Sequence, residues 1–172
     1  MGGRIALSLA NHQQVQGVIA LSSHPGLSSP LHRQERLASD LRWKQRLQTL
    51  PCEEFLSLWY QQEVFSSLQE SPELFQHLLI KRRYQNKEEL ASVLEMMSLA
   101  HQPSFSHCIV PSYFLYGEKD MKAHTLYTKL TGCYTVESIP LCGHTLHLEN
   151  PTLLTSKIHS WVHKHFEGRQ PI

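Results

Sequence analysis

The chain begins with MGGRIALSLA (residues 1–10), the stretch that decides which fold the sequence indicates. Gly2 and Gly3 stand directly before Arg4–Ala10, a segment of helix formers with an apolar face. This order is typical of the second half of a nucleophile elbow, G-x-S-x-G, in which a serine sits on a sharp strand-to-helix turn. In that alignment Met1 follows the serine and Gly2 closes the motif. The serine itself would precede the first residue, so the sequence reads as the back part of an enzyme.

The composition indicates one domain's worth of chain and argues against several classes of function. With 172 residues the chain is long enough to bury a core. Its 16 basic and 15 acidic side chains nearly balance, which suggests no nucleic-acid partner. No apolar run is long enough to cross a bilayer, so we expect no membrane partner. The 4 cysteines form no C-x-x-C pair, which favours a reduced, cytoplasmic protein without a zinc site or disulfide framework.

The pattern along the chain predicts three zones, namely 1–28, 29–103 and 104–172. The first and third zones alternate between helix and strand, while the second carries apolar residues at helical spacing and no convincing strand. Alternation with short links predicts a parallel sheet, here interrupted by a helical lid insertion. The expected strands are Gly17–Leu21, Ser112–Tyr116 and Tyr134–Ile139. The expected helices are Arg4–Ala10, Arg33–Leu50, Cys52–Tyr60, Pro72–Tyr84, Lys87–Leu99, Ala123–Leu130 and Pro151–His165.

Two residues stand where an open parallel sheet places its chemistry, at the carboxyl ends of strands. Asp120 follows the second expected strand in YGEKD, and His144 follows the third in LCGHTLHLENP. Each alone is a weak signal, because an Asp after a strand is usually a turn residue or a helix cap. Together with the elbow they give the order Ser, Asp, His of the hydrolase-fold triad. An imidazole takes the serine proton, and a carboxylate fixes the imidazole tautomer. The fold class predicted is therefore α/β, the C-terminal part of an α/β-hydrolase fold.

Six motifs give the sequence a more specific resemblance. They are HPGL (24–27), ERLASDLRW (35–43), WYQQEVFSSL (59–68), LASVLEMMSLAHQP (90–103), YGEKD (116–120) and GHTLHLENP (143–151). With these motifs the chain resembles the 2-succinyl-6-hydroxy-2,4-cyclohexadiene-1-carboxylate (SHCHC) synthases of menaquinone biosynthesis, in the α/β-hydrolase superfamily. The resemblance runs from Met1 to about His165.

The resemblance implies a carbon–oxygen lyase without a cofactor. Such an enzyme eliminates pyruvate from 2-succinyl-5-enolpyruvyl-6-hydroxy-3-cyclohexene-1-carboxylate. The serine, activated by His144 and Asp120, would help abstract a ring proton. The backbone N–H of Met1 would contribute to the oxyanion hole, since the residue after the serine supplies its main donor.

The resemblance also implies substrate-binding residues for a small-molecule tricarboxylate. Fixed cations are needed, and the planar fork of arginine suits carboxylates better than lysine does. Arg4, Arg36 and Arg82 fall at family positions, and Trp59 matches a tryptophan that faces the pocket in the family. The choice of Arg82 over Arg83 depends on an ungapped count and stays open.

One departure from the family pattern is large. Family members carry a further segment before this region, with the first strands, the oxyanion loop and the serine. We therefore expect this chain alone to be truncated, catalytically inactive and poorly soluble. We also expect the strand at Gly17–Leu21 to have no partner on one side, which favours association.

Two alternative functions stay open, and a metal site is disfavoured. The chain could belong to a generic esterase or thioesterase of the same fold, or it could be a non-catalytic fragment. His147 and Glu149 follow His144 closely, but no third ligand stands at suitable spacing, so we expect no metal.

Overall fold

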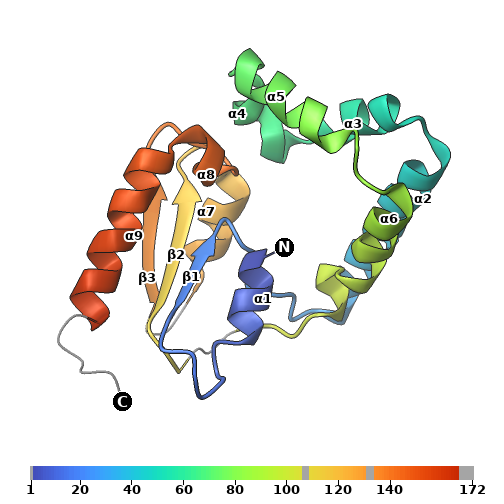
Figure 1. The fold of residues 1–172 in the computed structure, drawn as a ribbon. Coiled ribbons are helices and arrows are strands. Elements are labelled where there is room, and N and C mark those ends of the chain that lie inside the picture. Colours follow the sequence, from blue (N-terminus) through green and yellow to red (C-terminus); the bar gives the residue numbers. More distant parts are fainter. Residues whose placement is uncertain (1, 106–108, 131–133, 167–172) are drawn as a thin grey trace. The chain divides into compact units, whose positions relative to one another are not determined.

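The computed structural model describes residues 2–105, 109–130 and 134–166 (Figure 1). These residues form two compact units: a helical unit, Pro25–Phe105, and an α/β unit made of Gly2–His24 with the described residues after Phe105. The strands are β1 (Val18–Leu21), β2 (Ser112–Gly117) and β3 (Tyr134–Ile139). The α-helices are α1 (Gly2–Ser8), α2 (Pro30–Thr49), α3 (Cys52–Tyr60), α4 (Ser66–Gln69), α5 (Pro72–Arg82), α6 (Lys87–Met96), α7 (Met121–Tyr127), α8 (Leu146–Glu149) and α9 (Pro151–Phe166). Single 3-10 turns lie at Glu63–Phe65 and Leu99–His101.

The α/β unit is built on three parallel strands in the order β1-β2-β3, as the alternating pattern predicts. Val18 of β1 lies opposite Ser112 of β2, which in turn lies opposite Tyr134 of β3. Because the strands are parallel and in register, the loops that follow β2 and β3 emerge at the same edge of the sheet. Within the described residues, the other side of β1 carries no strand.

Helices cover both faces of this sheet (Figure 1). On one face, Tyr113 and Leu115 of β2 pack with Trp161 of α9, and the Tyr113 and Trp161 rings stack at 5.4 Å between centroids. On the other face, Phe114 meets Tyr127 of α7 edge to face at 5.1 Å. The alternation of inward side chains along β2 thus buries the strand from both sides, as expected for a parallel sheet.

The helical unit has its own apolar core. Its members come from α2 to α6, and the buried ones are Leu47, Phe55, Leu56, Tyr60, Leu68 and Ala91. Side-chain caps help to set the helix starts, because Ser29 accepts from the N–H of His32 and Asn86 accepts from those of Glu88 and Glu89. The apolar contacts and the helix caps of the helical unit therefore come from residues of that unit.

Several element bounds differ from the sequence expectation: α1 begins and ends two residues before the predicted Arg4–Ala10, and α5 and α6 end two and three residues earlier than predicted. The helix predicted at Ala123–Leu130 begins two residues earlier, because Asp120 caps α7 and thereby starts it at Met121. The short helix α8 was not predicted, since four residues are too few for a hydrophobic period to show. In the part of the chain that the structure describes, no helix has both the length and the apolar character to cross a membrane.

Gly26, near the start of the helical unit, has a backbone conformation and a close contact that a substitution can test. Its φ is +116°, and an added Cβ would lie 2.4 Å from the Cα of Ser104. We expect Gly26→Ala to lower the free energy of unfolding by roughly 1–3 kcal/mol, through a strained backbone and this clash. Urea unfolding followed by tryptophan fluorescence measures the change. Gly2→Ala is the matched control, because nothing lies within 4 Å of a Cβ added there. Equal stability of the Gly26 variant and wild type would contradict this account.

Candidate active site

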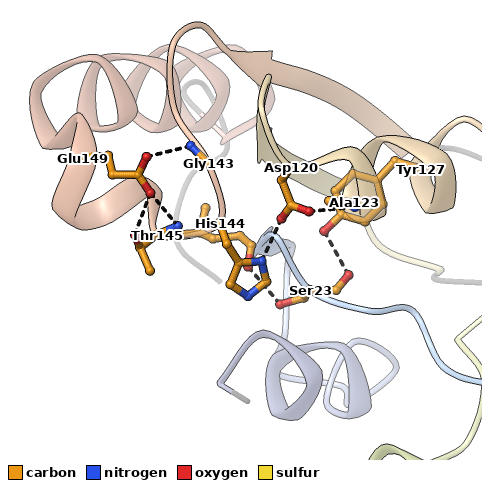
Figure 2. A network of polar contacts seen from close by, with 9 residues as sticks. Ser23, Asp120, Ala123, Tyr127, Gly143, His144, Thr145 and Glu149 are labelled. Carbon is orange, nitrogen blue, oxygen red and sulfur yellow. Dashed lines mark hydrogen bonds and ion pairs between the residues drawn. The ribbon is translucent and has the colours of Figure 1, made fainter. Parts of the chain in front are cut away.

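The structure brings Asp120 and His144 together at the carboxyl edge of the sheet (Figure 2). Asp120 lies in the loop between β2 and α7, and His144 in the loop between β3 and α8. The His144 Nδ1 lies 2.7 Å from the Asp120 Oδ2. The side chain of Asp120 is 3% exposed and that of His144 is 37% exposed. The Asp120 carboxylate is therefore buried, while the His144 imidazole is partly exposed to solvent.

Each oxygen of Asp120 has its own partner. Oδ1 accepts a hydrogen bond at 3.0 Å from the backbone N–H of Ala123, which caps α7. Oδ2 faces the imidazole of His144. The cap therefore fixes the orientation of the carboxylate that holds the histidine. The sequence allowed two interpretations of Asp120, a helix cap or the partner of a histidine. In the structure Asp120 makes both contacts, one with each carboxylate oxygen.

The electrostatics of the pair determine the tautomer of His144. Burial raises the pKa of the Asp120 carboxyl, but hydrogen bonds from His144 and from the Ala123 N–H, with the charge of His144, outweigh it. The net pKa lies below the usual value, so the carboxylate is ionised and only accepts. In the neutral form of the imidazole the proton is then at Nδ1, and Nε2 presents a lone pair. This is the arrangement that a histidine general base needs.

The loop that carries His144 passes directly over the end of β2. A Cβ added to Gly117, the last residue of β2, would lie 2.1 Å from the carbonyl oxygen of Gly143. The backbone N–H of Lys119 donates to the Cys142 carbonyl at 2.8 Å. Leu141 adopts a left-handed φ of 61°, and its N–H donates to the Glu118 carboxylate at 3.1 Å. The absence of a side chain at Gly117 therefore allows the loops that carry Asp120 and His144 to approach each other.

Tyr127 ties α7 to the loop that follows β1. Its hydroxyl donates to the carbonyl oxygen of Ser23 at 2.9 Å, and both groups are buried (Figure 2). Burial is also the main cause that raises the pKa of the Tyr127 phenol, so this hydroxyl stays a donor. The helix that Asp120 caps is thereby attached to two strands of the sheet.

The structure places the four predicted substrate-binding residues in separate settings. Arg4 is half-buried on α1 of the α/β unit, whereas Arg36, Trp59 and Arg82 belong to the helical unit. Trp59 packs in an aromatic group, 5.0 Å from Trp43 and 5.8 Å from Phe55 between ring centroids. Met1, the predicted oxyanion donor, lies outside the described residues.

Arg36 takes part in a polar network that sequence reasoning missed. Its Nε contacts both oxygens of Asp40, at 3.0 and 2.9 Å. Asp40 is buried at 6% exposure and also accepts from the hydroxyl of Ser98 at 2.7 Å. An acid one helical turn after an arginine is the sequence signal that could have indicated this pair.

Arg82 and Arg83 have different surroundings in the helical unit. Arg82 is exposed and donates to Gln85 at 3.3 Å. Arg83 pairs with Glu53 at 3.1 Å, and both border a cavity of about 290 Å³ within the helical unit. Arg83, the alternative that the sequence left open beside Arg82, borders that cavity, whereas Arg36, Trp59 and Arg82 do not line it. The remaining lining residues are Leu56, Ser57, Tyr60, Gln61, Gln69, Phe75 and Leu79.

The described residues contain no cluster of three or more His, Cys, Asp or Glu side chains that could hold a metal ion. Glu149, weighed in the sequence only as a companion of a metal ligand, instead binds the loop around His144 through backbone N–H groups. Its partners are the backbone N–H groups of Gly143 and Thr145 and the hydroxyl of Thr145, and the positions of these groups depend on the folded loop.

Comparison with known proteins gives these contacts a context. A curated SHCHC synthase from Photorhabdus laumondii is 34% identical over 169 residues, which cover 94% of this chain and 59% of that protein. The solved structure of MenH from S. aureus superposes with a TM-score of 0.87 at 26% identity, covering 95% of this chain and 65% of that one. The chain is a homologue of the SHCHC synthases. It spans between 59% and 65% of the first two curated relatives.

The structural likeness to MenH confirms the predicted α/β fold class for this SHCHC synthase homologue, over part of the length of such enzymes. A thermophilic esterase from Thermogutta terrifontis, in a malate-bound structure, shares the fold with a TM-score of 0.71 at 19% identity, covering 95% of this chain and 62% of that one. No protein-family model matches the chain. The fold is therefore common to a synthase and an esterase.

Acid titration tests the charge state of Asp120. Because its folded-state pKa is lowered, the carboxylate adds to the free energy of unfolding above the usual Asp pKa of about 3.9 and loses this effect as the pH falls. We expect the stability difference between wild type and Asp120→Asn to be largest near pH 7 and to shrink between about pH 5 and pH 2. Urea unfolding at a series of pH values measures it. A difference independent of pH would contradict a depressed pKa.

Proposed function

We propose that this chain provides the acid and the histidine of an SHCHC synthase, which eliminates pyruvate from 2-succinyl-5-enolpyruvyl-6-hydroxy-3-cyclohexene-1-carboxylate. The contact between His144 Nδ1 and Asp120 Oδ2 is the observation that carries the proposal. It forms in a chain homologous to these synthases over nearly all of its length. The nucleophile serine would come from the further segment that the family resemblance implies.

The proposed chemistry uses Asp120 and His144 as one unit. Asp120 keeps the Nδ1 proton in place, so Nε2 of His144 can accept the serine proton. The serine oxygen then takes a proton from the substrate ring. The electron pair of that C–H bond forms a ring double bond, the ring double bond already present moves by one position, and the carbon–oxygen bond to the enolpyruvyl group breaks. The oxygen leaves with its electron pair as the enolate of pyruvate, which takes up the proton held by the His144 imidazolium and becomes pyruvate.

Arg36 is the best-supported candidate for binding a substrate carboxylate. Asp40 engages its Nε, and the side chain is 44% exposed. The fork of terminal nitrogens is then oriented by a buried partner and can still bind a carboxylate in bidentate fashion. Arg4 and Arg82 complete the proposed set for the other carboxylates of the substrate, with Trp59 as an apolar wall.

The first test of this function is the loss of the proposed base. In the protein that carries the serine, His144→Ala should lower pyruvate release by about 100-fold or more, since general acid–base transfer contributes at least that much. A coupled assay that reduces the released pyruvate measures the rate. His147→Ala is the matched control, because His147 is exposed on α8 and lies outside the Asp120–His144 pair. Full activity of the His144 variant would refute its role as the base.

Arginine variants separate the synthase from a generic esterase. Arg36→Ala should cost roughly 1.5–3 kcal/mol in kcat/KM for the tricarboxylate, the worth of a hydrogen bond between charged groups. An uncharged ester substrate should be turned over at the wild-type rate, if it is turned over at all. Equal loss on both substrates would mean that Arg36 does not recognise a carboxylate.

The ion pair with Asp40 makes a stability control necessary. Arg36→Ala leaves the buried Asp40 without its cation, so we expect this variant to unfold at a lower temperature than wild type. Asp40→Asn breaks the same ion pair but keeps the guanidinium. A kcat/KM loss that is several-fold larger in Arg36→Ala than in Asp40→Asn supports substrate binding. Equal losses in the two variants would assign Arg36 a structural role.

A further inference from the structure

The carboxylate of Glu149, the last residue of α8, binds the loop on both sides of His144 (Figure 2). Oε2 accepts a hydrogen bond from the backbone N–H of Gly143 at 2.7 Å. Oε1 accepts from the backbone N–H of Thr145 at 3.0 Å and from its hydroxyl at 2.6 Å. His144 stands between these two amides, so one side chain holds the residues before and after the histidine.

Helix capping explains only half of this arrangement. Thr145 is the N-cap of α8, and a carboxylate that reaches back to the N-cap N–H is common at the first turn of a helix. Gly143 lies two residues before that N-cap, outside any capping pattern. A cap alone would leave one oxygen of Glu149 for solvent, whereas here that oxygen makes the shorter of the two amide contacts.

The rest of the loop is held by other residues. Lys119 N–H binds the Cys142 carbonyl, and the Glu118 carboxylate binds the N–H of Leu141. These contacts fix the part of the loop near β3. The segment that carries the imidazole depends on Glu149, and its contacts are charge-assisted and partly buried, which makes them stronger than neutral ones.

We propose that Glu149 is the positioning residue for His144: its carboxylate locks the amides of Gly143 and Thr145, so that Nδ1 meets Asp120 and Nε2 faces the reacting group. The inference rests on the proposed function for the role of His144 as a base. Glu149 takes no part in proton transfer. It removes backbone freedom that would otherwise misplace the imidazole, and small misplacements of a catalytic group are costly.

NMR of the protein that carries the serine, labelled with ¹⁵N-histidine, tests the positioning without any substrate. The proton on His144 Nδ1 is hydrogen-bonded to the buried carboxylate of Asp120. Its NMR signal should therefore lie far downfield, and it should exchange slowly with water. Glu149→Gln replaces one acceptor oxygen with an NH₂ donor, which leaves Gly143 or Thr145 without its acceptor. We expect proton exchange at Nδ1 to become about 10-fold faster, the equivalent of one lost charged hydrogen bond.

Glu137→Gln is the matched control. Glu137 is a carboxylate of the same unit with two side-chain partners, Tyr113 and Lys157, and neither partner belongs to the loop of His144. Its variant should leave the Nδ1 proton unchanged. An unchanged exchange rate in Glu149→Gln, or equal acceleration in both variants, would overturn the proposal. If Glu149→Gln does not fold, Glu149→Asp takes its place with the same expectations, because the shorter side chain cannot reach both amides.

Turnover provides the second measurement. In the protein that carries the serine, Glu149→Gln should lower kcat by about 10-fold and leave KM within about 2-fold, because the substrate-binding arginines are untouched. A rise in KM with unchanged kcat would overturn the positioning role. Absence of pyruvate release in the unmodified protein would count against the proposed function alone, since the NMR measurement needs no reaction.

Discussion

The hydrogen bond between Asp120 and His144 is the contact on which the rest of the candidate site depends. It joins loops from neighbouring parallel strands, and the register of β2 with β3 brings those loops to one edge of the sheet. Gly117 makes the join possible, because any side chain there would meet the carbonyls of Cys142 and Gly143. The site is therefore a property of the sheet rather than of either loop alone.

Burial of the Asp120 carboxylate makes the site and the fold interdependent. Removing an ionised carboxyl from water is costly unless hydrogen bonds replace the lost solvent. Asp120 obtains them from the Ala123 N–H, which starts α7, and from His144. A loop arrangement that separated Asp120 from His144 would leave a poorly solvated charge, so the folded state itself favours the aligned pair. Glu149 acts on the other partner, by holding the backbone on either side of His144.

The sequence predicts those parts of the molecule that depend on patterns. Strand and helix alternation indicates the parallel sheet, and the bounds predicted for β3 agree with the structure. The rule that chemistry follows strand ends selects Asp120 and His144. The contact between Arg36 and Asp40 spans one helical turn, so the sequence pattern could have indicated it. The contact of Asp40 with Ser98 and that of Glu149 with Gly143 could not be predicted, because they depend on a distant side chain and on the direction of a backbone N–H group. Arg82 and Arg83 are neighbours with the same chemistry, and the motif count cannot separate them.

The two units each hold their polar groups by internal contacts. In the helical unit, Ser98 and Arg36 both bind Asp40, so the guanidinium is oriented by residues of that unit alone. In the α/β unit, Asp120 contacts His144, and Glu149 binds the N–H groups of Gly143 and Thr145. The proposed proton transfer and the proposed binding of a carboxylate by Arg36 thus depend on different sets of contacts. Substitutions in the helical unit can then change which substrate is bound while the acid–histidine pair keeps its geometry, a separation that suits a fold shared by a synthase and an esterase.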